Sequence, residues 1–269
     1  MISPHADSVF CRVQLPSGAA RHAAVDGAVL RVLDAAPWAG GRPTGQTLPL
    51  PGARLLAPSE PKNILCLANA YAGKEKDPSK TIRWFAKTAS AAAADHDAVE
   101  LPDIVDQLKS EVEVVVVVGA RLKHATESDA HAAIFGYTVG NEIFGFPEAF
   151  KRRWGEDIDR PEPMLAAGLK LGDKFSPFGP FIHRGTAWPQ ARRTLRINNP
   201  RTGKSLEYQG TTQGFLYSPE QTLAQLSRVL TLEPGDVVFT GSTAALLLDR
   251  GDSVVAEIEG LGTLHNTIV

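Results

Sequence analysis

Residues 110–119 read SEVEVVVVVG, in which two glutamates precede five consecutive valines. β-Branched side chains suit the pleated surface of a sheet, so this run predicts a buried strand. Side chains alternate between the two faces of a strand. Glu111 and Glu113 are therefore expected on one face, in line with Val115 and Val117.

This pair of carboxylates has two interpretations. Neighbouring carboxylates repel one another, and burying either one unpaired costs on the order of several kcal/mol. A hard divalent cation removes both costs, because Mg²⁺, Mn²⁺ and Ca²⁺ prefer carboxylate oxygens. Alternatively, the strand begins at the surface and both side chains are solvated. The local pattern leaves both interpretations open.

Composition narrows the class of protein. The chain has 269 residues, 43% hydrophobic and 22% charged, as in ordinary globular proteins. Its formal net charge of −2, without a basic block, does not favour nucleic-acid binding. No apolar run approaches the ~20 residues that cross a bilayer, and the first residues lack the pattern of a secretory signal. Cys11 and Cys66 have no metal or redox spacing. We expect a soluble cytoplasmic protein.

The remaining pattern is mostly strands and turns. It predicts strands over 8–14, 24–34, 62–71 and 135–143, several more in the last third, and short helices over 127–134 and 219–230. The Gly/Pro-rich residues 36–52 are interpreted as a linker. We therefore predict a β-rich α+β fold, with a small N-terminal module and linker over 1–57 and a main domain over 58–269.

Five segments in order resemble the fumarylacetoacetate hydrolase superfamily over roughly residues 60–269. They are the Glu-Val-Glu strand, GYTVGNE (136–142), KLGDKFSPFGPF (170–181), LEPGDVVFTG (232–241) and the closing GDSVVAEIEGLGTLHNTIV (251–269). Each is weak alone, and together they are specific. The resemblance implies a mixed β-sheet roll, a metal-dependent enzyme and a homodimer.

The resemblance also implies a metal site and its ligands. Mg²⁺ or Mn²⁺, with Ca²⁺ as a further option, would be held by Glu111, Glu113 and Glu142, and a bidentate 2-oxo acid would complete the coordination. Glu142 stands where hydrolase branches of the family usually carry Asp. The hydratase and decarboxylase branch carries Glu there, so this position favours that branch.

Other family positions imply contacts with the substrate. Lys170 matches a lysine that approaches the substrate and stabilises an enolate or orients a carboxylate. Tyr71, Tyr137 and Thr243 match pocket residues. For Tyr137 a half-buried core position is the alternative. The TGSTA segment around Thr243 departs from the usual Thr-Gly-Thr-Pro.

The chain departs from the family where water is activated. Family hydrolases carry a histidine three residues after the tyrosine and an acid three further on, whereas this chain has Lys74 and Asp77 after Tyr71. A lysine is a poor base at neutral pH, so Lys74 is a catalytic candidate, a cationic anchor or a solvated loop residue. His96, His124 and His131 have no sequence partner at metal-ligand spacing and are expected at the surface. For His96 a place on a mobile lid that reaches the pocket is the alternative.

Three functions remain open. The first is C–C bond hydrolysis of a β-diketo acid such as an acylpyruvate, through a metal-stabilised enolate. The second is hydration, decarboxylation or tautomerisation of a 2-oxo or 2-hydroxydienoate acid, which needs only proton delivery. The third is ligand binding without catalysis. We expect hydrolysis of a small 2-oxo acid.

Overall fold

The structure is a computed structural model, and it describes residues 8–71, 82–146, 149, 170–185 and 190–269. None of the helices in these ranges is long and apolar enough to cross a membrane. The first half of the described chain contains β1 (Ser8–Gln14), β2 (Ala20–Asp26), β3 (Val29–Leu33), β4 (Pro43–Pro49), β5 (Leu55–Leu56), β6 (Ile64–Ala68), β7 (Arg83–Lys87), β8 (Ala92–Ala93), β9 (Ala98–Val99), β10 (Leu108–Val118), α1 (Glu127–Ala133) and β11 (Ile134–Phe144).

The second half of the described chain adds seven further strands and a helix: β12 (Ser176–Arg184), β13 (Arg192–Asn199), β14 (Lys204–Thr211), α4 (Pro219–Val229), β15 (Val237–Phe239), β16 (Leu246–Leu248), β17 (Ser253–Ile258) and β18 (Gly262–Ile268). Short 3₁₀ turns lie at Pro37–Ala39 and Ala89–Ala91. Thr126 caps α1 and Ser218 caps α4, each in a capping box. The predicted helices over 127–134 and 219–230 are therefore confirmed.

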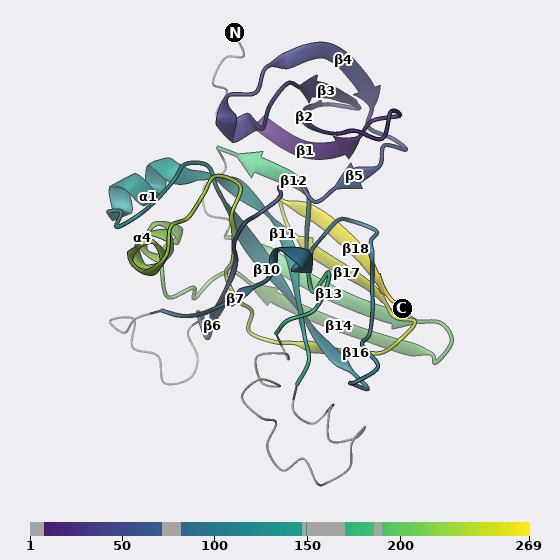
Figure 1. Cartoon of the computed structure of the whole chain (residues 1–269). Coiled ribbons are helices and arrows are strands. Elements are labelled where there is room, and N and C mark those ends of the chain that lie inside the picture. Colours follow the sequence, from purple (N-terminus) through teal and green to yellow (C-terminus); the bar gives the residue numbers. More distant parts are fainter. Residues whose placement is uncertain (1–7, 72–81, 147–148, 150–169, 186–189) are drawn as a thin grey trace.

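Two mixed sheets form the fold (Figure 1). Among the described residues the larger sheet has the order β4-β3-β2-β1-β12-β11-β10-β15-β6-β7, with β5, β8 and β16 attached beside this path. The smaller sheet has the order β14-β13-β17-β18-β9. Most neighbours are antiparallel, but β6 pairs parallel with β15, and β9 pairs parallel with β18. The predicted β-rich fold with mixed sheets is confirmed.

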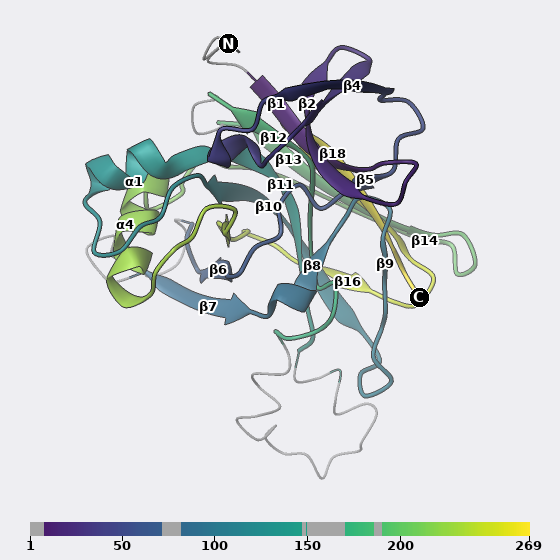
Figure 2. The same cartoon turned by 45° about the horizontal axis from the view of Figure 1, so that its top comes forward.

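Strand β10 lies inside the larger sheet and divides the core, because its side chains alternate. Val112, Val114, Val116 and Val118 face one hydrophobic cluster, which also contains apolar residues of α1, α4 and the smaller sheet. Val115 and Val117 face a second cluster with Phe178 and Phe239. Helices α1 and α4 lie side by side at one side of the molecule in both views (Figure 2). The valine run is buried on both faces, as its composition predicts.

The N-terminal strands share the larger sheet, because β1 pairs antiparallel with β12. Two predictions in this region are wrong. The predicted strand over 24–34 is two strands, β2 and β3, which reverse at Gly27 (φ 57°). The predicted linker over 36–52 contains β4, which pairs with β3. Strand β4 is the edge strand, where a proline's missing N–H disturbs no second neighbour, so its prolines are tolerated. The boundary at residue 57 stays a prediction.

Candidate active site

Strand β10 places the two glutamates as its alternation predicts. Glu113 is 1% exposed. Glu111, two residues nearer the start of the strand, is partly buried. Gly241, whose φ is 85°, donates its backbone N–H to Glu113 Oε2 at 2.6 Å. A positive φ favours glycine, so the turn after β15 supplies this donor at low conformational cost. The interpretation that both carboxylates are solvated is wrong for Glu113.

Strand β11 brings the third carboxylate. In the antiparallel register Glu142 lies directly opposite Glu111, and both therefore project from the same face. Ligand oxygens of Glu111, Glu113 and Glu142 all lie within 4.8 Å of one another. Glu142 is 1% exposed, so its carboxylate lies inside the fold. We call these three residues the carboxylate cluster.

Two lysines hold Glu142 in place. Lys87 Nζ lies 2.6 Å from Glu142 Oε1 and is fully buried, and it also donates to the carbonyl oxygens of Ile143 and Phe175. Lys170 Nζ donates to Glu142 Oε2 at 2.9 Å from a side chain that is 31% exposed. The Lys170 ammonium also lies 3.4 Å from the centroid of the Phe144 ring. The structure thus brings the predicted Lys170 to the cluster.

Lys87 was not identified from the sequence. The one available signal was a lysine at the end of the strand RWFAK, and strand ends usually meet solvent. Its burial depends on β6, which carries β7 against the larger sheet, and on the chain around Phe175. Neither contact can be read from local spacing. Lys87 acts on Glu142 and is therefore a positioning residue.

Crowding raises the pKa of two of the carboxyl groups. Burial, followed by repulsion from Glu142, raises the pKa of Glu111 to about 7. Burial, followed by repulsion from Glu111 and Glu142, holds the pKa of Glu113 well above its usual range. Converging carboxylate oxygens that resist ionisation together are the donor set and the electrostatic environment that suit a hard divalent cation. Glu111, Glu113 and Glu142 fit Mg²⁺ or Mn²⁺ in this respect.

A buried arginine lies beside the cluster. Arg193, on β13, is 0% exposed, and its guanidinium donates to Gly241 O at 3.0 Å and Thr243 Oγ1 at 3.4 Å. It lies 4.3 Å from the centroid of the Tyr71 ring. Within the described ranges no carboxylate forms a salt bridge with Arg193, and its buried Nε has no hydrogen-bond partner. No sequence pattern indicates a buried role for Arg193, because arginines on strands usually face solvent.

Two of the predicted substrate contacts, Thr243 and Tyr71, lie against Arg193. Thr243 Oγ1 accepts from Arg193 and forms a short hydrogen bond with the hydroxyl of Tyr208. Tyr71 is 2% exposed, and its pKa is raised, first by burial and against the lowering effect of Arg193. Tyr71 and Thr243 therefore flank the same cation, although their contact with a substrate stays a prediction.

Tyr137 is not brought to this place. It lies opposite Val116 in the β10–β11 register and belongs to the hydrophobic cluster on that face, away from the face that carries Glu111, Glu113 and Glu142. Burial, followed by the charge of Glu220 on α4, raises its pKa. Side chains alternate between the two faces of a strand, so Tyr137 and Glu142, which are an odd number of residues apart on β11, point to opposite faces. From this placement we expect Tyr137 to be a core residue and not a substrate contact. Lys74 and Asp77 lie outside the described residues.

Known families match most of the chain. A family profile described as fumarylacetoacetate (FAA) hydrolase C-terminal matches residues 62–269, and one described as Rv2993c-like, N-terminal matches residues 10–58. The chain is 30% identical over 240 residues to a fumarylacetoacetate hydrolase domain-containing protein 2 homolog of Dictyostelium discoideum, which covers 82% of this chain and 76% of that protein.

Two further proteins carry names that state an activity. The chain is 29% identical over 235 residues to the human oxaloacetate tautomerase FAHD2A, mitochondrial, over 82% of this chain and 71% of that protein. A 5-carboxymethyl-2-hydroxymuconate delta-isomerase structure from Mycobacterium smegmatis superposes with a TM-score of 0.79 at 27% identity. The superposition covers 97% of this chain and 99% of the chain from Mycobacterium smegmatis. Both names describe isomerisations.

Proposed function

The chain belongs to the fumarylacetoacetate hydrolase family, and we propose that it is a divalent-metal-dependent isomerase that interconverts enol and keto forms of a small 2-oxo dicarboxylic acid. The observation that carries this proposal is the carboxylate cluster with Lys170 at its edge. It offers a cation site and a movable proton in one place. The names of the tautomerase and the isomerase support the same reaction class.

Three roles are assigned to the residues of this site: ion binding, positioning of Glu142 and proton donation. Glu111, Glu113 and Glu142 would hold Mg²⁺ or Mn²⁺. When bound, the ion supplies Lewis-acid stabilisation of the negative charge on the 2-oxo group. Lys87, fixed by two backbone carbonyls, keeps Glu142 oriented toward the cluster. Lys170, the more exposed lysine, donates a proton to the carbon next to the 2-oxo group while the enol hydroxyl gives its proton to solvent.

Arg193 would bind the second carboxylate of the substrate, the one that does not chelate the ion. A buried guanidinium without a carboxylate partner in the described part of the chain favours an anionic ligand, and bidentate carboxylate binding is the geometry that arginine suits best. Thr243 and Tyr71 complete this anion-binding corner. In oxaloacetate a single methylene would separate this carboxylate from the 2-oxo group, and in a dienoate a longer chain would do so.

C–C bond hydrolysis of an acylpyruvate, as predicted from the sequence, is the second candidate. It needs a base that activates water. None of the histidines that the structure describes belongs to the carboxylate cluster. The partly buried rings of Phe85 and Phe144 beside Lys170 favour it, because they would accept an apolar acyl tail.

One experiment separates the two reactions. EDTA-treated protein is supplied with Mn²⁺ and either enol oxaloacetate or acetylpyruvate, and the products are followed by NMR. We expect metal-dependent loss of the enol signal of oxaloacetate, which Lys170→Met abolishes and the exposed-lysine control Lys123→Met does not. Release of acetate and pyruvate from acetylpyruvate would instead establish hydrolysis. Neither reaction, with metal bound, would reject both proposals.

A second variant tests the substrate class. Arg193→Met should raise the KM for a dicarboxylic 2-oxo acid by roughly tenfold or more, since a charge-assisted bond is worth about 1.5–3 kcal/mol. It should change the KM for a monocarboxylic 2-oxo acid much less. Equal effects on both substrates would show that Arg193 only supports the fold.

A further inference from the structure

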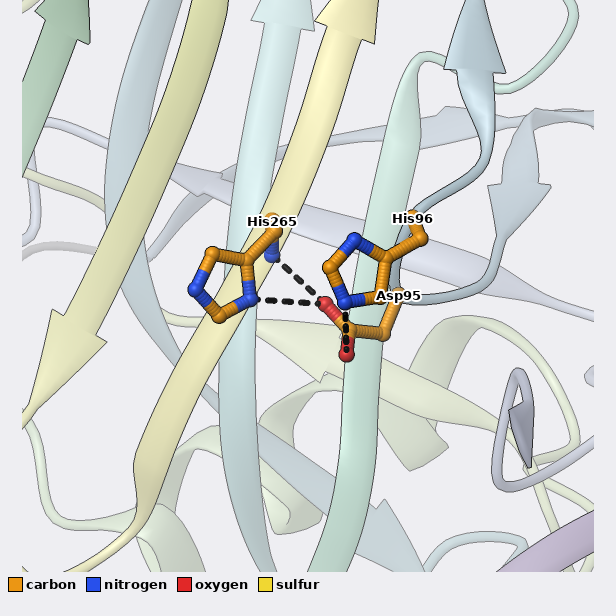
Figure 3. Close-up of side chains that lie close together, drawn as sticks. All are labelled: Asp95, His96 and His265. Atoms are coloured by element: carbon orange, nitrogen blue, oxygen red, sulfur yellow. Dashed lines mark hydrogen bonds and ion pairs between the residues drawn. The ribbon is translucent and has the colours of Figure 1, made fainter. Parts of the chain in front are cut away.

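Three side chains with metal-binding atoms meet outside the carboxylate cluster. Asp95 and His96 lie in the connection between β8 and β9, and His265 lies on β18 (Figure 3). Asp95 Oδ1 is 3.2 Å from His265 Nδ1, and Asp95 Oδ2 is 3.5 Å from His96 Nε2. One ligand atom of each residue lies within 4.8 Å of the other two. We call this set the Asp–His–His cluster.

The backbone fixes this arrangement. His96 donates its N–H to His265 O at 2.6 Å, and His265 donates its N–H to Asp95 Oδ1 at 2.7 Å. The Asn266 side chain donates to both Ala94 O and Asp97 O, which closes the connection around the cluster. His96 holds the left-handed conformation, with φ 64°. The cluster is therefore pre-organised by main-chain contacts and does not depend on long, mobile side chains.

The side chains converge in a way that suits an ion. The two imidazole rings stack with centroids 4.9 Å apart and an interplanar angle of 4°, and the nitrogens nearest to Asp95 both face its carboxylate (Figure 3). In a tetrahedral zinc site, bonds of about 2.0–2.1 Å put neighbouring ligand atoms about 3.3 Å apart. His265 Nδ1 lies 3.2 Å from Asp95 Oδ1 and His96 Nε2 lies 3.5 Å from Asp95 Oδ2, so each imidazole is at about this distance from one oxygen of the same carboxylate.

We propose that Asp95, His96 and His265 form a second metal site, which binds a divalent first-row transition ion such as Zn²⁺. Two imidazoles and one carboxylate select such ions over Mg²⁺, which prefers oxygen ligands only. The side chains of His96 and His265 are 71% and 42% exposed, so water reaches the remaining coordination position.

The position of the site indicates a structural role. Strand β8 pairs with β12 of the larger sheet, whereas β9 pairs with β18 of the smaller sheet. Residues 94–97 are thus the crossover between the two sheets, and the ion would fasten this crossover to β18. The site shares no residue with the carboxylate cluster, so this proposal does not depend on the proposed function.

The test uses tag-free full-length protein, stripped with EDTA and dialysed against Zn²⁺ in excess Mg²⁺. We expect His96→Asn and His265→Gln each to bind about one zinc ion fewer per chain than the wild type. His124→Asn is the matched control, because His124 is also exposed and has a positive φ of 52°. Asn tolerates that conformation, so His96→Asn should fold even if His265→Gln does not.

Spectroscopy supplies a second readout. Cu²⁺ added in place of Zn²⁺ should show nitrogen hyperfine splitting from imidazole ligands in the wild type and in His124→Asn, and lose it in His96→Asn. Zn²⁺ should raise the Tm of the same two proteins and leave that of His96→Asn unchanged. Equal zinc content in the wild type and His96→Asn, or a copper spectrum without this nitrogen signal, would overturn the proposal.

Discussion

The carboxylate cluster and the Asp–His–His cluster each gather three metal-binding side chains, but they differ in construction. The carboxylate cluster stands on two hydrogen-bonded strands in a buried part of the larger sheet, where two lysines offset most of its charge. The Asp–His–His cluster joins a short connection to a strand that begins more than 160 residues later, and its two imidazoles are 71% and 42% exposed.

This difference teaches which kind of ion each place can hold. Burial and mutual repulsion make Glu111 and Glu113 resist ionisation, so a hard cation there relieves an electrostatic cost already present in the fold. The exposed imidazoles offer nitrogen ligands instead, which suit first-row transition ions. The first cluster should therefore control activity, and the second should control only the stability of the crossover. Four predictions test this division.

The largest effect should come from Glu113→Ala. Loss of the central carboxylate should abolish Mn²⁺ binding at the carboxylate cluster and lower turnover on the order of 10³-fold, because a Lewis acid contributes several kcal/mol to the transition state. Calorimetry with Mn²⁺ and the enol assay measure both. Zinc binding at the Asp–His–His cluster should persist. A folded Glu113→Ala protein with full activity would remove the carboxylate cluster from the mechanism.

The next prediction separates the two lysines on Glu142. Lys87→Met should lower the free energy of unfolding by about 3–5 kcal/mol, since it removes the buried partner of Glu142 Oε1 and the side-chain donor to two carbonyl oxygens. Lys170→Met should lower it by under about 1 kcal/mol, because Lys170 is partly exposed. Urea denaturation checks this contrast. Similar losses for both variants would show that the two lysines share one structural role.

The pH dependence of the free energy of unfolding should be a smaller effect than the loss of Lys87. The folded pKa of Glu111 is about 7, above its unfolded value, so its contribution to stability is complete at low pH and is lost as pH rises through about 7. We expect EDTA-treated protein to lose on the order of 2–3 kcal/mol from this group between pH 5 and pH 8. Mg²⁺ should cancel the loss, because it binds the ionised form and releases protons.

Thermal unfolding across this pH range measures the effect, with Glu111→Gln as its control. The slope of stability against pH should flatten in that variant. A slope identical to that of the wild type would mean that Glu111 ionises normally in the folded protein.

The smallest effect is expected from Tyr137→Phe. The hydroxyl lies on the face of β11 away from the carboxylate cluster, so turnover should change by less than about twofold and stability by about 1 kcal/mol. Steady-state kinetics with the enol substrate measure it. A large loss of turnover with normal stability would return Tyr137 to the substrate site.

Local pattern accounts for a large part of this molecule. Strand β10, its alternation and the shared face of Glu111 and Glu113 follow from side-chain period and valine content alone. The caps of α1 and α4 follow from Thr126 and Ser218. The sequence pattern led to a wrong prediction at β4, because its Gly and Pro residues indicate a linker. A strand forms there only because β4 lies at the edge of the sheet.

The remaining features depended on contacts between distant residues. Lys87 and Arg193 look like ordinary strand residues, and only the packing of β7 and β13 makes them buried cations beside three acids. His96 was expected at the surface without a metal-binding partner. Its side chain is exposed, but the structure supplies Asp95 and His265 as neighbours. The sequence determined which residues share a strand face, because that depends on a fixed two-residue period. Only tertiary structure decided which faces and connections meet, because that depends on how separate strands pair.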